Sequence, residues 1–200
     1  MTKDWYRNKT WNTEVEEKFF EKLNRSRSNR DQYLVIQALT LASNFPDATL
    51  RLVAQYFETR NDKFNDTRAL LAKTEAYLAM DKLNMAIESY HALLESEDEY
   101  PRILSGAYVD YPYLVATQKI ETEYENALNV LKKHVDRLAF PLERFKWYAA
   151  KALIENDENF ASKALEAAKV KKSGFRFHQN LGLVGKEHAI TIKNLRKICT

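Results

Sequence analysis

The chain has 200 residues, of which 45% are hydrophobic and 30% charged, and a formal net charge of +3, values typical of a folded rather than a disordered protein. Only four Gly and four Pro occur, too few for the many turns of an all-β or α/β protein, so the composition predicts an all-α protein. The single cysteine, Cys199, excludes an intramolecular disulfide and a cysteine cluster for zinc, and so small a net charge does not by itself indicate a nucleic-acid partner.

The first third of the chain predicts a polar, aromatic leader followed by three helices. Thr13 and Glu16 have the spacing of a capping box, which predicts that the first helix begins there. A second helix is expected over about Arg30–Ala42. Pro46 begins a third, because the residue before a proline avoids the helical conformation. Three rings of the leader are expected to lie across the first helix: Trp5, Tyr6 and Trp11.

Apolar residues at helical spacing predict most of the remaining chain as further helices. Their expected ranges are Thr67–Met80, Leu83–Glu95, a helix delayed or broken by Gly106 and Pro112, Glu123–Leu138, Pro141–Glu155, and a helix that follows Asn156–Glu158 and ends near Lys169–Lys172. Three of the four glycines then fall in Gly174–Gly185, which predicts an ordered loop or a short extended hairpin. A final helix is expected over Glu187–Ile198.

The segment Leu70–Glu95 contains two amphipathic patterns that meet at the polar turn Asp81-Lys82, with small residues where two helices must approach closely. Five of its residues resemble the signature positions of a tetratricopeptide repeat (TPR), with one clear unit at about 67–95. These residues are Leu70, Tyr77, Ala86, Tyr90 and Leu93. Ala48, Ala127 and Ala161 occupy positions similar to Ala86, at irregular intervals of 38, 41 and 34 residues.

The resemblance implies a right-handed stack of antiparallel helix pairs, a TPR-like α-solenoid, because one such unit cannot bury its apolar face alone. It places the whole chain, 1–200, in a single helical domain. Residues 1–27 form the leader and first helix, 28–172 the helix-pair repeats, and 173–200 the glycine-containing loop and a capping helix.

By the same resemblance, the first helix of each pair lines a concave face that binds a peptide or a small protein. Residues three and four positions apart share one helical side. The partner-binding residues expected on this face are Arg30, Tyr33, Gln37 and Thr40, then Arg68, Leu71 and Glu75, then Lys146 and Ala150. An adaptor, a secretion-type chaperone and an immunity protein that blocks a toxin all fit this description.

No motif predicts catalysis, a metal or a cofactor, so the expected function is not enzymatic. Leu181–Lys186 lacks the glycine spacing and the Ser or Thr of a phosphate-binding loop, and the four histidines lack metal-ligand spacing. The acidic residues Glu95, Glu97, Asp98 and Glu99 are expected to form one solvated run.

The N-terminal residues carry charges throughout, and no segment approaches 18 uninterrupted apolar residues. We therefore expect no signal peptide, no membrane partner and a cytoplasmic location. The alternative to protein binding is nucleic-acid binding by a helical-repeat protein, which would use basic patches at Lys22–Arg30 and Lys169–Lys172.

Overall fold

The protein is all-helical in the computed structural model, which describes residues 4–26 and 28–200. Helices contain 70% of the described residues and no strand occurs among them, which confirms the all-α prediction. The chain forms two compact units, the N-terminal unit Met1–Ser105 and the C-terminal unit Gly106–Thr200. Their boundary lies between Ser105 and Gly106, the glycine that was expected to delay or break the next helix.

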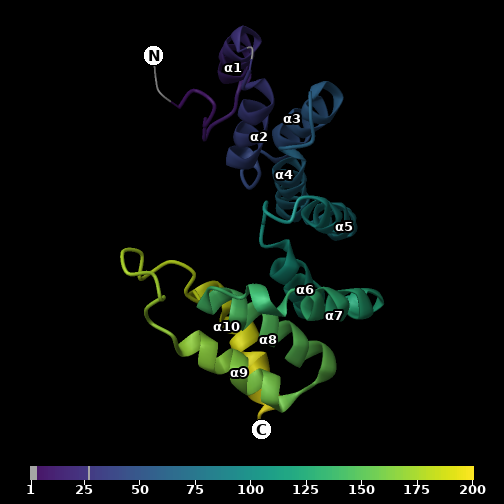
Figure 1. Cartoon of the computed structure of the whole chain (residues 1–200), viewed down its shortest axis with the longest axis vertical. Helices are drawn as coiled ribbons and strands as arrows, with labels where there is room; N and C mark the ends of the chain where they lie inside the picture. The colour runs from purple at the N-terminus through teal and green to yellow at the C-terminus, as the bar shows by residue number, and fades with distance from the viewer. Residues whose placement is uncertain (1–3, 27) are drawn as a thin grey trace. The chain divides into compact units, whose positions relative to one another are not determined.

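The N-terminal unit consists of helices that pack against their neighbours in chain order (Figure 1). They are α1 (Thr13–Arg25), α2 (Arg30–Leu41), α3 (Pro46–Thr59), α4 (Asp66–Ala79) and α5 (Leu83–Glu99). Helix α2 packs against α3, α4 packs against α5, and α4 also contacts both α2 and α3. Their shared core buries Leu34, Leu52 and Tyr56 completely or nearly so. The Tyr56 hydroxyl donates to the Asp66 carboxylate at 2.7 Å, which ties α3 to the start of α4.

The start of α1 differs from the expected capping box. Asn12 rather than Thr13 is the cap, and its side-chain oxygen accepts a hydrogen bond from the backbone N–H of Val15 at 2.9 Å. The Glu16 carboxylate instead accepts from the indole N–H of Trp11 at 3.0 Å. Asn is as good a cap as Thr, so two adjacent candidates competed and the sequence pattern selected the wrong one.

The C-terminal unit contains a second set of packed helices. They are α6 (Ala107–Gln118), α7 (Tyr124–Lys133), α8 (Pro141–Glu155), α9 (Glu158–Lys169) and α10 (Ala189–Ile198), with short 3-10 turns at Glu121–Glu123, Val135–Arg137 and Lys186–His188. Helix α6 packs against α7 and α8, α8 packs against α9, and α10 packs on α9 and α8. Pro112 lies inside α6 without ending it, and the helix expected to reach Leu138 ends at Lys133.

Four alanines lie at corresponding places in the two units. Ala48, Ala86, Ala127 and Ala161 are the third or fourth residues of α3, α5, α7 and α9, and each is at most 5% exposed. A small side chain there allows close contact with the preceding helix of each pair. The second helix of every predicted pair therefore has, in its first turn, the buried alanine that the sequence pattern indicated.

The segment 170–185, here called the basic loop, has no regular secondary structure and projects from the helices of the C-terminal unit (Figure 1). The short hairpin considered for it is therefore absent. The Phe175 ring stacks on Phe140, with ring centroids 4.9 Å apart, and anchors the loop to the start of α8. Gly182 has a φ of +67°, and a Cβ there would lie 2.4 Å from the Phe140 ring, so this position requires glycine.

Candidate functional site

The face of α2 that carries Tyr33 and Gln37, two of the predicted partner-binding residues, is partly covered by the leader of the same chain. Gln37 is completely buried. Its side-chain oxygen accepts from both the backbone and side-chain N–H groups of Asn8, each at 2.9 Å. Its side-chain NH₂ donates to the Asn8 carbonyl oxygen at 2.8 Å. One glutamine amide thus binds both polar groups of the Asn8 backbone.

Aromatic rings extend this contact toward α1. Tyr33, one turn before Gln37, stacks on Tyr6 with ring centroids 4.4 Å apart and meets Trp5 edge-on at 4.9 Å. Trp5 and Trp11 also contact Phe19 of α1. The leader therefore reaches both α1 and α2, whereas the sequence indicated α1 alone.

The structure places the expected partner-binding residues in different surroundings. Gln37 is buried, so it is not exposed on a binding face as expected. The Arg30 guanidinium is directed at the Asn24 side chain, 3.3 Å away, at the turn between α1 and α2. Glu75 is half-buried on α4. Lys146 belongs to the C-terminal unit, where its ammonium group pairs with Asp110 at 2.5 Å.

Arg68 does lie beside residues of α2, at an open groove of about 490 Å³. We call this the α2–α4 groove. Its lining comes from the leader, from α2 and from the first turn of α4, and consists of Arg7, Gln32, Ile36, Leu39, Thr40 and Arg68. Ile36 and Leu39 are half-buried, whereas Arg7, Gln32 and Arg68 are exposed.

The lining of the α2–α4 groove is basic and apolar. Two guanidinium groups, of Arg7 and Arg68, are present and no carboxylate. The Thr40 hydroxyl donates to the Ile36 carbonyl at 2.7 Å, which holds that side chain against its own helix. Arg68 has one long hydrogen bond, to the Asn65 side chain at 3.4 Å. A negatively charged segment with an apolar side chain would complement such a lining.

A buried polar network surrounds Lys146 in the C-terminal unit. The Tyr113 hydroxyl shares hydrogen bonds with His188 Nδ1 at 2.9 Å and with the Thr191 hydroxyl at 2.7 Å. Burial lowers the pKa of His188, and the positive charge of Lys146 lowers it further. Tyr113, His188 and Thr191 thus hydrogen-bond to one another and hold α6 against the start of α10. Their role is structural.

Sequence reasoning missed Arg7, Gln32, Ile36 and Leu39 as groove residues. Gln32, Ile36 and Thr40 lie four positions apart, so helical spacing alone could have placed them on one face. The contribution of Arg7 has no such local signal, because it depends on a leader that folds back over residues about thirty positions later.

No three His, Cys, Asp or Glu side chains of the described residues come together in a way that could hold a metal ion. No helix in residues 4–26 or 28–200 is long and apolar enough to cross a membrane. Comparisons with protein-family models, with curated proteins and with solved structures found no match for this chain.

Proposed function

We propose that this protein is a non-catalytic protein-interaction module built from TPR-like helix pairs, and that its α2–α4 groove binds an acidic segment of a partner protein. The repeat assignment is supported by the four buried alanines, each in the first turn of the second helix of a pair. The pairs α2/α3 and α4/α5 also pack on one another through α4, as expected for neighbouring repeats.

The observation that carries the binding proposal is the composition of the groove. Arg7 and Arg68 flank the apolar residues Ile36 and Leu39, and no carboxylate lines the groove to neutralise them. Arginine forms paired hydrogen bonds with carboxylates, and covering the exposed parts of Ile36 and Leu39 with a partner's apolar side chain is favourable. A segment with both acidic and apolar residues satisfies both requirements.

The contact between α2 and the leader gives further support. Gln37 binds the N–H and the carbonyl of Asn8, two groups that every peptide backbone carries at non-proline residues. The face of α2 that carries Gln37 thus already binds one non-helical segment, the leader of its own chain. The proposed groove for a partner's segment lies next to it. An adaptor, a secretion-type chaperone and an immunity protein each need this kind of surface.

Selection from a library of random 12-residue peptides on the immobilised full chain tests the proposal. We expect enrichment of peptides that combine Asp or Glu with apolar residues. The variant Arg68→Glu should lose these peptides, because it places a carboxylate in the groove. Lys82→Glu makes the same charge change on an exposed side chain in the turn between α4 and α5, and should enrich the same peptides as the parent.

Two results would contradict the proposal. One is the absence of any enriched acidic class on the parent protein. The other is equal loss of the acidic class in both variants, which would show that net charge rather than the α2–α4 groove recognises the peptides.

A further inference from the structure

The last 42 residues, 159–200, are strongly basic and belong entirely to the C-terminal unit. They contain nine Lys or Arg residues and two acidic residues, Glu166 and Glu187. Glu166 already pairs with Lys169 at 2.6 Å, and Glu187 lies 3.6 Å from the His188 ring, whose pKa is lowered by burial. Most of the positive charge of this segment is therefore uncompensated within the segment.

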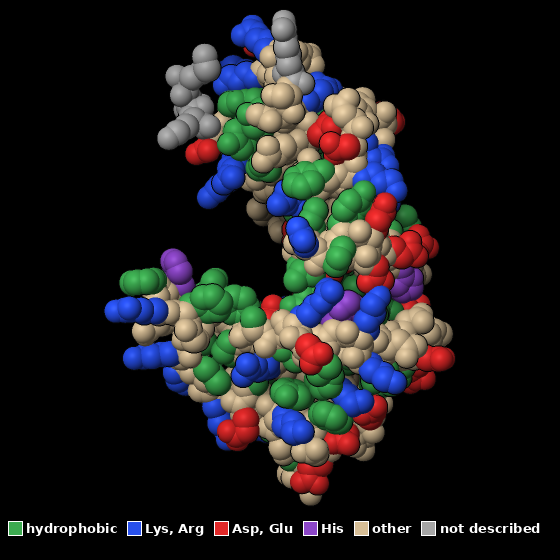
Figure 2. Space-filling view, in the orientation of Figure 1, with side chains coloured by type: hydrophobic (Ala, Val, Ile, Leu, Met, Phe, Trp, Pro, Cys, Tyr) green, Lys and Arg blue, Asp and Glu red, His purple; other side chains and the backbone are tan. Residues whose placement is uncertain are grey.

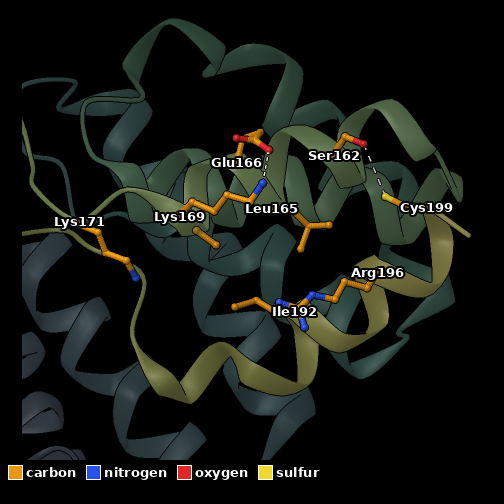
Figure 3. Close-up of a pocket in the computed structure, with 9 residues that line it drawn as sticks. Ser162, Leu165, Glu166, Lys169, Lys171, Ile192, Arg196 and Cys199 are labelled. Atoms are coloured by element: carbon orange, nitrogen blue, oxygen red, sulfur yellow. Dashed lines mark hydrogen bonds and ion pairs between the residues drawn. The ribbon is translucent and has the colours of Figure 1, made fainter.

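Much of this charge lines two grooves that run along α9. The α9–α10 groove, of about 490 Å³, contains Lys169, Lys171 and Arg196 (Figure 3). The α8–α9 groove, of about 630 Å³, contains Arg144, Lys163 and Lys172. Ser162 and Glu166 line both grooves, so the two adjoin across one helix. Six cations and one carboxylate thus border a continuous surface.

Helix stability accounts for only part of this arrangement. Basic residues in the last turn of a helix interact favourably with its C-terminal carbonyls, which explains Lys169 on α9 and Arg196 on α10. Arg144 is the fourth residue of α8, near the N-terminus of that helix, where the helix dipole does not favour a cation. The convergence of cations from α8, α9 and α10 on the same two grooves is a property of the tertiary fold.

The basic loop adds exposed aromatic rings beside these grooves. Ser173 closes the loop, because its N–H donates to the Gln179 carbonyl at 2.7 Å and its hydroxyl donates to the His178 carbonyl at 2.9 Å. Phe177 is 83% exposed, and the Arg176 guanidinium lies 5.4 Å from the centre of its ring. Figure 2 shows hydrophobic, basic and histidine side chains together on this projecting loop.

We propose that the basic loop and the two grooves along α9 form a binding surface for single-stranded nucleic acid. A chain of phosphates fits a row of cations on both sides of one helix, and unpaired bases stack on exposed rings and guanidinium planes. A duplex offers no free base face to Phe177. A flat bilayer would not enter the grooves that hold the cations. This site lies in the C-terminal unit and is independent of the α2–α4 groove.

Fluorescence anisotropy with labelled 20-nucleotide U and dT single strands tests the proposal on the full chain. We expect binding at 50 mM salt that weakens as salt rises. If about four phosphates are contacted, the logarithmic slope is about −3, a loss of roughly 50-fold between 50 and 200 mM. Lys171→Ala with Arg196→Ala removes two contacts, so the slope should become shallower by about 1.4 and binding should fall about tenfold or more.

Two controls distinguish binding at this surface from nonspecific attraction to the positive charge of the whole protein. Lys132→Ala with Lys133→Ala makes the same charge change at exposed residues at the end of α7 and should bind within about twofold of the parent. Phe177→Ala should weaken binding about fivefold or more, whereas Phe177→Tyr keeps a ring and should bind like the parent. Circular dichroism of each variant verifies that it is folded.

Several results would overturn the proposal. One is no binding of either strand at 50 mM salt. Another is equal loss in the two double variants. A third is unchanged binding in Phe177→Ala. Binding to vesicles that contain phosphatidylserine without binding to either strand would also overturn it, and would identify the surface as a membrane contact.

Discussion

The contact between Gln37 and Asn8 predicts a large loss of stability when the glutamine is truncated. Gln37→Ala removes three hydrogen bonds, all between 2.8 and 2.9 Å, from a completely buried side chain. Each such bond contributes about 0.5–1.5 kcal/mol net. Together they predict a decrease of about 2–4 kcal/mol in the free energy of unfolding. Release of the leader into water limits the decrease, because the freed Asn8 groups then regain hydrogen bonds with solvent.

Urea denaturation followed by circular dichroism measures this loss, and hydrogen exchange with mass spectrometry measures release of the leader. In Gln37→Ala, the backbone amides of residues 5–11 should exchange faster than in the parent, and the change should be confined to the N-terminal unit. Gln32→Ala is the matched control, since Gln32 lies on the same helix but is exposed, and its effect should stay within about 0.5 kcal/mol. Equal stability and equal exchange for the two variants would refute the assigned role of Gln37.

Three other sites carry predictions of stability. Ala86→Trp should lower the free energy of unfolding by about 3 kcal/mol or more, because Ala86 is completely buried. Ala54→Trp, at an exposed position of α3, is the control and should not lower it. Equal urea midpoints for the two variants would contradict the pairing of α4 and α5. Tyr56→Phe should lower the free energy of unfolding by about 1–3 kcal/mol by leaving the buried Asp66 carboxylate without that donor, and unchanged melting would show that the bond is not needed. The pKa of His188 is lower in the folded chain than in the unfolded chain, so its contribution to stability is present above about pH 6.5 and is lost as pH falls below that value. Urea titrations from pH 7.5 to 5 should therefore show a smaller loss in His188→Gln than in the parent, and equal losses would contradict the assignment.

Local patterns were sufficient to predict the helices and a buried alanine in the first turn of four of them. Ala48, Ala86, Ala127 and Ala161 were identified from the sequence, and all four are buried near the start of a helix. This succeeded because helical periodicity and a small residue at a close approach are properties of a few neighbouring positions. The competing caps Asn12 and Thr13 show the resolution of such reasoning, which is about one residue.

Buried polar side chains were not predictable in this way. Glu97 was expected in a solvated acidic run, yet it is 1% exposed and accepts hydrogen bonds from the backbone and hydroxyl of Ser105. Gln37 was expected to face a partner and instead binds Asn8. Each partner lies in an irregular segment, and the path of such a segment is set by tertiary contacts rather than by periodicity.

Both errors arise where an irregular segment lies over a helix. In the stack of helix pairs that we propose for this protein, a terminal pair has no neighbour on its outer side, so some other part of the chain must cover its apolar surface. In the N-terminal unit, α1 and the leader cover α2, and the leader buries Gln37 as it does so. In the C-terminal unit, α10 covers α8 and α9 and buries Leu195 completely. A covering segment has a backbone whose polar groups need partners, and a glutamine or glutamate on the helix beneath supplies them. A polar residue on the terminal helix pair of such a stack therefore binds either the covering segment or a partner protein. Only the path of the covering segment shows which of these two roles the residue has.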